Sequence, residues 1–149
     1  LNLSKYKEKK YNFNTSFGPT YNVAEASINE NSDSNGWGVN GNFWGSIQLP
    51  FKLEISTDGN YQYNGKTQVI QESFERFIWN ASVTKKFLKS DNLRVSITGR
   101  DLLNQNVGFN RSAFNGNINQ STYTTIQRYF MFSVSWDFSK MGGGEIKQN

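Results

Sequence analysis

Cysteine and histidine are both missing from the 149 residues of this sequence. Without cysteine there is no disulfide framework and no thiolate metal site, and without histidine the commonest general base and metal ligand is absent. The acidic residues are spread among expected loops and strand ends. No catalytic constellation is visible, so we expect a protein that is not an enzyme and that holds no cofactor and no metal.

Long hydrophobic runs are missing too. Hydrophobic residues make up 36% of the chain, which is below the roughly 45–50% of a typical globular domain. No stretch approaches the roughly 18 apolar residues that a membrane-spanning helix needs. The basic residues are scattered rather than clustered, so the sequence shows no nucleic-acid footprint.

Aromatic residues, in contrast, are abundant, since they make up 15% of the chain with 12 Phe, 7 Tyr and 4 Trp. A low apolar content with many aromatics is unusual for a soluble core. It fits a sheet that has one apolar face and one wet face, as the wall of a membrane-spanning β-barrel has.

Six stretches of the chain alternate between apolar and polar residues. This period indicates β-strands, because successive side chains of a strand point to opposite faces. The six stretches span residues 11–23, 37–49, 53–63, 77–87, 93–100 and 126–138. Several exceed the roughly 5–6 residues usual in soluble strands and reach the roughly 9–11 that a tilted membrane strand needs. We therefore expect an all-β, antiparallel transmembrane segment of about six long strands.

The connections between these stretches alternate in length. Residues 24–36, 64–73 and 101–122 form long connections, whereas residues 50–52 and 89–91 form tight turns. Outer-membrane barrels have long extracellular loops and short periplasmic turns. The alternation therefore predicts that the tight turns face the periplasm and the long loops face the outside.

The expected organisation follows from this reading. Residues 1–138 would hold the C-terminal transmembrane strands with their extracellular loops, and residues 139–149, which contain three consecutive glycines, would form a flexible periplasmic tail.

The aromatic residues also fall near the two expected ends of the strands. Trp37, Tyr61, Tyr63, Phe77 and Trp79 lie near one rim, and Tyr11, Phe51, Phe87, Trp136 and Phe138 lie near the other. Two such girdles are expected at the two membrane interfaces. A soluble antiparallel sandwich also alternates, but it has no reason to sort its aromatics by height.

Two stretches carry a resemblance to a known family. The last strand, Arg128-Tyr-Phe-Met-Phe-Ser-Val-Ser-Trp-Asp-Phe138, resembles the terminal strand of outer-membrane barrels, whose alternating apolar residues and final aromatic are read by the barrel assembly machinery. Asp101-Leu-Leu-Asn-Gln-Asn106 follows a strand and opens the longest loop. Together they are similar to the C-terminal region of TonB-dependent receptors, especially the outer-membrane β-barrel family common in Bacteroidetes. The resemblance covers about residues 75–141, although the tail after Phe138 departs from the usual ending.

The resemblance implies a larger protein in the outer membrane of a Gram-negative bacterium. It would have a barrel of about 22 strands, a plug, and a periplasmic segment that meets TonB, and it would take up a scarce nutrient such as an iron chelate, a cofactor or a glycan. About six strands cannot close a transmembrane pore, since the smallest barrels have eight. The expected partners are therefore the remaining barrel strands and the plug, outer-membrane lipid, the assembly machinery and, through an N-terminal region, TonB. No nucleic acid is expected.

Several residues are candidates for contacts with a ligand or with the plug. Trp44 interrupts the polar face of its strand, where an aromatic side chain packs on a plug or stacks on a flat ligand. Arg100 and Asp101 stand where a strand leaves the membrane, and either touch ligand or pair with a neighbouring strand. The following loop adds Asn104, Gln105, Asn106 and Phe109, which either order the loop or line a vestibule.

The expected assembly signature consists of Phe130, Phe132, Val134, Trp136 and Phe138. Arg128, about ten residues above Phe138, is a candidate contact for a lipid headgroup, because a guanidinium can meet phosphate with two parallel hydrogen bonds. Its alternative partner is a loop carboxylate of a neighbouring strand. Two further functions stay open at this point: a structural or secretion-linked barrel, and a soluble β-sandwich binding module.

Overall fold

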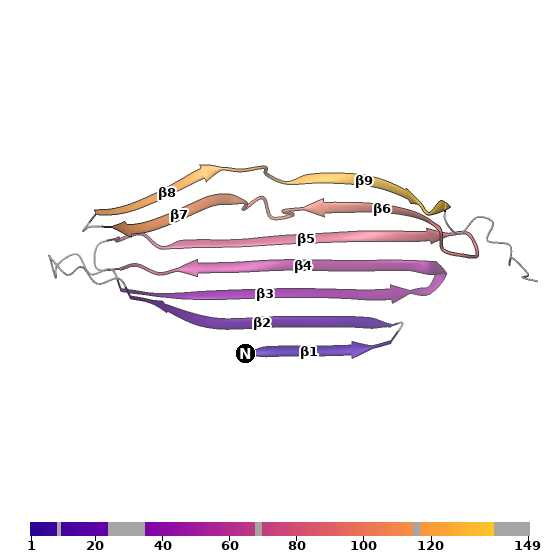
Figure 1. Ribbon diagram of the computed structural model, residues 1–149, viewed down its shortest axis with the longest axis horizontal. Helices are drawn as coiled ribbons and strands as arrows, with labels where there is room; N and C mark the ends of the chain where they lie inside the picture. The colour runs from indigo at the N-terminus through magenta and orange to yellow at the C-terminus, as the bar shows by residue number, and fades with distance from the viewer. Residues whose placement is uncertain (9, 24–34, 68–69, 115–116, 139–149) are drawn as a thin grey trace, which may run out of the picture.

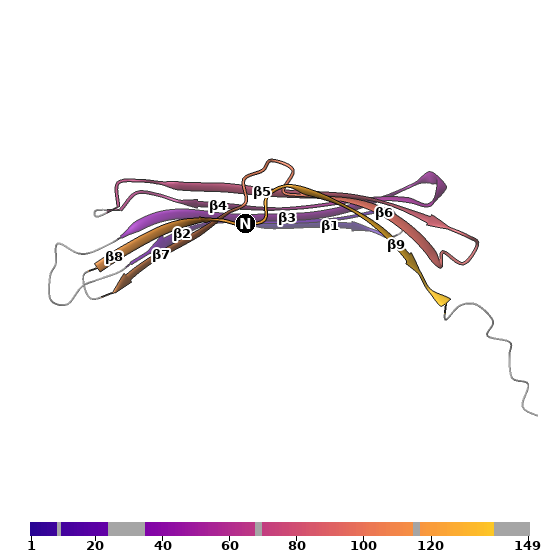
Figure 2. The ribbon, with the colours of Figure 1, turned by 90° about the horizontal axis from the view of Figure 1, so that it is seen from above.

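The computed structural model describes residues 1–8, 10–23, 35–67, 70–114 and 117–138, without the side chains of 111–114 and 117–118. Within these residues the chain is built from β-strands in one bowed layer (Figures 1 and 2). No helix in the described part is long and apolar enough to cross a membrane.

Nine strands follow one another along the described chain, and a 3-10 turn, η2 (Pro50–Lys52), connects the third to the fourth. They are β1 (Asn2–Lys7), β2 (Tyr11–Asn22), β3 (Gly36–Leu49), β4 (Leu53–Asn64), β5 (Phe74–Phe87), β6 (Leu93–Arg100), β7 (Val107–Phe114), β8 (Asn117–Thr124) and β9 (Tyr129–Trp136).

Seven of these strands form one antiparallel sheet in the order β1-β2-β3-β4-β5-β6-β9. The other two, β7 and β8, pair with each other as a separate hairpin at the end of the sheet opposite the tight turns (Figure 1). Because β6 ends at Arg100 while β5 reaches Phe74 at that end, the hairpin continues the layer beyond the short strand β6.

All six strands expected from the sequence are present, with ends shifted by a few residues. The expected count was nevertheless too low. β1 was not predicted, and the expected loop over residues 101–122 instead contains a tight turn, β7 and most of β8. The predicted loop over 24–36 lies largely outside the described residues, as does the predicted tail over 139–149.

The register confirms the two-faced sheet that the alternation predicted. Paired residues in antiparallel strands share a face, and Ile47 pairs with Ile55, which pairs with Val83. Odd-numbered residues of β1 to β6 and even-numbered residues of β9 therefore lie on one face, which we call the apolar face. The others lie on the opposite face, which we call the polar face.

The β3–β4 and β5–β6 turns are held side by side at one end of the large sheet. Phe51 and Lys52 adopt positive φ angles of 63° and 60°, and Leu88 and Asp91 of 67° and 57°. Lys52 Nζ crosses between the turns to donate to Asp91 Oδ1 at 2.7 Å and to the Leu88 carbonyl at 2.6 Å. This contact fixes the β3–β4 and β5–β6 turns side by side, and we call this end of the sheet the turn end.

Candidate functional site

Hydrogen bonds and an ion pair between side chains join β4 to β5 across the polar face. From the turn end towards the other end, the pairs are Lys86–Glu54 at 2.9 Å, Ser56–Ser82 at 2.7 Å, Asn80–Asp58 at 2.6 Å and Arg76–Gln62 at 3.0 Å. Every charge in this ladder has a neutral or opposite partner. Such a surface suits contact with water or with another polar protein surface, and it would be costly against hydrocarbon.

The apolar face exposes large hydrophobic side chains in rows. One row runs across five paired strands through Ile47, Ile55, Val83, Ile97 and Phe132. These side chains are 38% to 67% exposed. Among the described residues, Phe74 is the only hydrophobic side chain that counts as buried. A soluble protein rarely leaves so continuous an apolar surface uncovered, so this face requires an apolar environment.

Aromatic side chains gather towards both ends of the apolar face. Away from the turns, Tyr61 pairs with Phe77, and the next pair is Gly59 with Trp79. At the turn end, Phe87 pairs with Leu93, which pairs with Trp136. Trp136 also stacks on Phe138, with ring centroids 4.8 Å apart. The rows between these ends carry Ile, Val, Ala and Gly together with several Phe residues, so the sorting by height is partial.

Glycines on the apolar face lie under aromatic rings of the neighbouring strands. A Cβ atom at Gly59 would meet Phe43 Cζ at 2.7 Å, and one at Gly41 would meet Phe17 Cδ2 at 2.8 Å. The rings therefore lie against exposed backbone, an arrangement known to stabilise glycines in sheets. Sequence reasoning missed these pairs because they depend on register between strands.

The stretch Asp101 to Asn106 forms a tight turn organised by a buried carboxylate. Asp101 is only 3% exposed, and its two carboxylate oxygens accept the backbone N–H groups of Gln105 at 2.9 Å and Asn106 at 3.0 Å. Its carbonyl also accepts the N–H of Asn104 at 2.9 Å. Asp101 and Asn104 adopt positive φ angles of 52° and 56°, which Asp and Asn tolerate better than most residues.

This outer turn, residues 101–106, also covers the edge of β5 that β6 leaves free. Leu102 N donates to the Trp79 carbonyl at 2.8 Å, and Asp101 N donates to Asn80 Oδ1 at 2.9 Å. Gln105 Oε1 accepts the backbone N–H of Phe77 at 3.0 Å. Backbone groups at this edge of β5 are thus hydrogen-bonded without another strand. A backbone segment near hydrocarbon needs such hydrogen bonds, because no water is there to provide them.

On its other side, the outer turn holds the approach to β9. Asn106 Nδ2 donates to the Ile126 carbonyl at 3.0 Å, and Thr125 Oγ1 donates to the Asn106 carbonyl at 2.5 Å. Asn104 Oδ1 accepts the backbone N–H of Arg128 at 3.1 Å. Asn104, Gln105 and Asn106 therefore make hydrogen bonds within the protein, as the loop-ordering alternative expected. A ligand contact for them stays a prediction.

Next to the outer turn, Arg76 joins the polar face to the β7–β8 hairpin. Its Nη1 donates to the Val107 carbonyl at 2.7 Å, and its guanidinium lies over the Phe74 ring, 5.8 Å from the centroid. Phe74 stacks in turn on Phe109 at 3.9 Å between ring centroids. Phe109 thus contributes to packing of the hairpin on β5. The sequence did not indicate Arg76 and Phe74, because their contacts are with residues that are distant in sequence.

The remaining candidates do not converge on one site. Trp44 lies in the middle of β3 on the polar face, is 44% exposed, and has Asn14 and Asp58 as its neighbours in register. Arg100 lies on the same face at the end of β6, where it is paired in register with Tyr129 and exposed. The described residues contain no group of three or more His, Cys, Asp or Glu side chains placed to hold a metal ion.

Arg128 lies in a bend just before β9. Its Nη1 donates to the Leu102 carbonyl at 3.3 Å. This partner is a backbone oxygen of the outer turn, whereas the sequence suggested either a lipid phosphate or a loop carboxylate. The side chain is exposed, so a lipid contact through its remaining donors stays a prediction.

The five residues of the expected assembly signature lie at the end of the described chain. Phe130, Phe132, Val134 and Trp136 alternate onto the apolar face of β9, and Phe138 follows the strand. All five are exposed, from 48% for Trp136 to 68% for Phe130. Among the described strands, β9 pairs only with β6, so its other edge is open.

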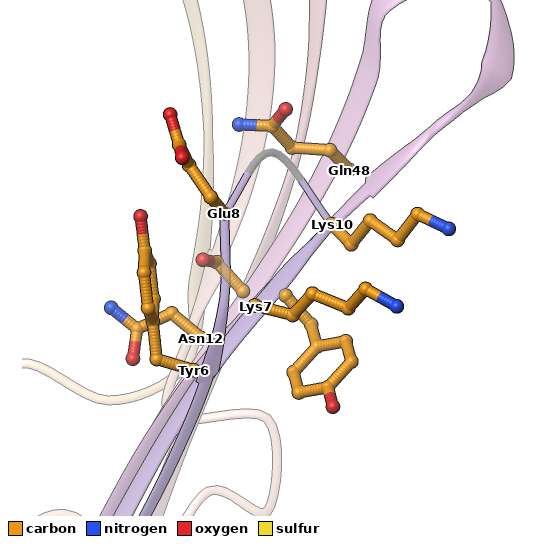
Figure 3. A pocket seen from close by; sticks show the side chains of 8 residues that line it. Tyr6, Lys7, Glu8, Lys10, Asn12 and Gln48 are labelled. Carbon is orange, nitrogen blue, oxygen red and sulfur yellow. The ribbon is translucent and has the colours of Figure 1, made fainter.

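Two shallow hollows occur near the two ends of the sheet. One, of about 580 Å³, is lined by Tyr61, Glu75, Phe77 and Gln105 beside the outer turn, where Tyr61 donates its hydroxyl proton to Glu75 Oε1 at 3.1 Å. The other, of about 310 Å³, lies at the β1–β2 turn (Figure 3).

A model of the outer membrane protein beta-barrel family matches residues 1–136. No curated protein and no solved structure matches this chain.

Proposed function

Since the chain belongs to the outer membrane protein beta-barrel family, we propose that its sheet is part of the barrel wall of a TonB-dependent receptor. The receptor would import a scarce nutrient, such as an iron chelate, a cofactor or a glycan, across the outer membrane of a Gram-negative bacterium. The C-terminal resemblance to such receptors in Bacteroidetes supports this assignment. The protein would carry its ligand without bond chemistry.

The observation that carries the proposal is the division of one sheet into two unlike faces. The apolar face exposes the row from Ile47 to Phe132, and it would meet lipid. The polar face carries the ladder between β4 and β5, and it would line the lumen and meet the plug. Trp44, whose exposed indole lies on that face, would then contact the plug.

The edges of the sheet fit a larger barrel. Among the described strands, β1 pairs only with β2 and β9 only with β6. Each unpaired backbone N–H or C=O group in hydrocarbon costs roughly several kcal/mol, because it has no hydrogen-bond partner there. Both edges would therefore pair with further strands, and the barrel assembly machinery would act on the signature in β9.

A structural or secretion-linked barrel is the second candidate, because a two-faced wall serves it equally well. The soluble sandwich is disfavoured by the family match and by the uncovered apolar face.

A measurement of ligand uptake by whole cells distinguishes the transport proposal from the structural barrel. Cells with and without the intact gene would be given labelled iron chelate, cobalamin or oligosaccharide, with and without a protonophore. The transport proposal expects accumulation of one ligand that needs both the gene and the proton gradient, whereas a gene-independent result for all three would favour the structural barrel.

A further inference from the structure

The apolar face carries few charged side chains, and they are divided between its two ends. Within the described strands of that face they are Lys5, Lys7 and Lys85 towards the turn end and Glu75 at the other end. Lys10 in the β1–β2 turn adds a further cation at the turn end. The cations on this face therefore lie at only one of the two expected membrane interfaces.

Lys7 and Lys10 lie next to each other across the β1–β2 turn. The N–H of Lys10 donates to the Lys7 carbonyl at 3.0 Å. Their side chains extend to the same side of the turn, and Glu8, Tyr6 and Asn12 extend to the other (Figure 3). Among the described residues, neither amine has a carboxylate within ion-pair distance. Tyr11 shares the apolar face with Lys7, its partner in register.

Lys85 marks where the apolar surface ends. It lies on the apolar face of β5, and its Nζ reaches towards the turn to donate to the Phe51 carbonyl. On the way it lies 6.0 Å from the centroids of both Phe51 and Phe87. A lysine that extends its amine past aromatic rings to a polar group behaves as lysines do at a membrane interface.

The β1–β2 lysines flank a turn that lies at the same end of the sheet as the β3–β4 and β5–β6 turns (Figure 1). Lys7 pairs with Tyr11, and the same row continues through Ile47 and Ile55 to Val83. Barrel strands tilt by roughly 35–45° against the barrel axis, so this row does not stay at one depth, and the depth of each residue is set by its distance from its own turn. Lys7 and Lys10 are therefore close to the level at which lipid headgroups would lie if the apolar face meets hydrocarbon.

We propose that Lys7 and Lys10, with Lys5 and the ring of Tyr11, bind the phosphate of an anionic glycerophospholipid in the periplasmic leaflet. This rests on the proposed function, because it needs the apolar face in lipid and the turn end in the periplasm. The paired ammonium groups attract the negatively charged phosphate, and the apolar row beside them would contact the acyl chains. Glu75, which lies at the opposite end of this face, makes that end a poorer site for an anion.

Native mass spectrometry of the intact protein from lipid vesicles tests this assignment. The vesicles would contain phosphatidylcholine with or without phosphatidylglycerol. The variants are Lys7→Gln/Lys10→Gln and the charge-preserving Lys7→Arg/Lys10→Arg. Arg94→Gln is the matched control, since Arg94 is an exposed cation near the same end but on the polar face.

Each lysine near an anionic surface contributes roughly 1 kcal/mol, or about fivefold in affinity. The glutamine pair should lower phosphatidylglycerol binding on the order of 30-fold at low salt, whereas the arginine pair and Arg94→Gln should retain it. Unchanged phosphatidylglycerol binding in the glutamine pair, or equal loss in Arg94→Gln, would overturn the site while leaving the barrel proposal standing. If the wild type retains neither phospholipid, the apolar face does not meet lipid and the proposed function itself fails.

Discussion

Asp101 shows how one residue can organise a segment that looks unstructured in the sequence. Its carboxylate is buried yet accepts two backbone N–H groups, and its own N–H donates to Asn80. A buried carboxylate is tolerated when its oxygens are hydrogen-bonded. The sequence identified Asp101 as notable, but it could not distinguish a ligand contact from this role, because the acceptors and donors come from different parts of the chain.

Replacing Asp101 should loosen the outer turn. Asp101→Ala removes both acceptors and leaves two backbone N–H groups short of partners, at a cost of about 1–3 kcal/mol for each group. Urea titration of the intact protein in lipid vesicles would measure the loss of stability, and hydrogen exchange would show it in residues 101–109. Arg100→Ala, which changes an exposed neighbour, should have little effect. Equal stability of the two variants would show that the turn does not depend on the carboxylate.

Neighbouring residues on β5 and β6 test the two faces separately. Val83 pairs with Ile97 on the apolar face, and Ser82 pairs with Thr98 on the polar face. Val83→Arg and Ile97→Arg should each cost about 2–4 kcal/mol at mid-membrane, whereas Ser82→Arg and Thr98→Arg should cost much less. Folding titrations in vesicles measure all four. Similar penalties on both faces would mean that the lumen is not wet at this level.

At the scale of elements, the long strands and the turns at 50–52 and 89–91 were predictable, whereas β1 and the hairpin within residues 101–122 were not. Two-residue alternation is a local signal, so the six long strands could be placed from the order of apolar and polar residues alone. β1 has alternating residues too, but it is short and includes Lys5 and Lys7 where apolar residues were expected. The hairpin of β7 and β8 was missed because Asn117 to Thr124 is almost entirely polar, so that strand has no apolar side to recognise.

The contacts of Arg76 and Arg128 could not be predicted either, because they join segments distant in sequence. Arg76 bonds to Val107, and Arg128 bonds to Leu102. Their partners are backbone oxygens, which every residue has. Residue type therefore gives no information about such a pairing, and only the register and the path of the chain determine it.

The pairing of glycines with aromatic rings stabilises neighbouring strands, and one pair of variants can measure it. Gly59→Ala would place a methyl group against the Phe43 ring. Overpacking of this kind costs roughly 1–3 kcal/mol. Gly18→Ala is the matched control, because a Cβ there meets nothing within 4 Å. Urea unfolding in vesicles should show a loss for Gly59→Ala and almost none for Gly18→Ala, and the reverse order would contradict the packing described here.

At the scale of the whole molecule, the architecture is one layer with no second layer over either face among the described residues (Figure 2). Such a sheet is stable only if its surroundings differ on the two sides. The proposed barrel would provide that difference, with lipid against the apolar face and a wet lumen against the polar face. Membership of an outer-membrane barrel family supports these surroundings independently of the geometry.

The orientation in the membrane is a separate prediction about the whole molecule. Lys66 and Ser90 are both exposed and lie at opposite ends of the sheet. In the intact protein, Lys66→Cys should react with a membrane-impermeant thiol reagent on whole cells, whereas Ser90→Cys should react only after the outer membrane is broken. The unsubstituted intact protein would be treated in the same way, so that labelling of any other cysteine can be subtracted. Labelling of Ser90→Cys but not of Lys66→Cys on whole cells would reverse the orientation.

The central claim is that one face of this sheet meets lipid and the other meets the lumen. Spin labels on adjacent residues of β5 test it most directly. Val83→Cys and Ser82→Cys would be labelled in turn in the intact protein, reconstituted in lipid vesicles. Collision with oxygen, which is concentrated in lipid, and with a water-soluble nickel chelate would then be measured. The account predicts that the label at 83 collides mainly with oxygen and is shielded from nickel, while the label at 82 shows lower oxygen and higher nickel accessibility. Equal accessibilities at the two positions, or the reverse order, would contradict it.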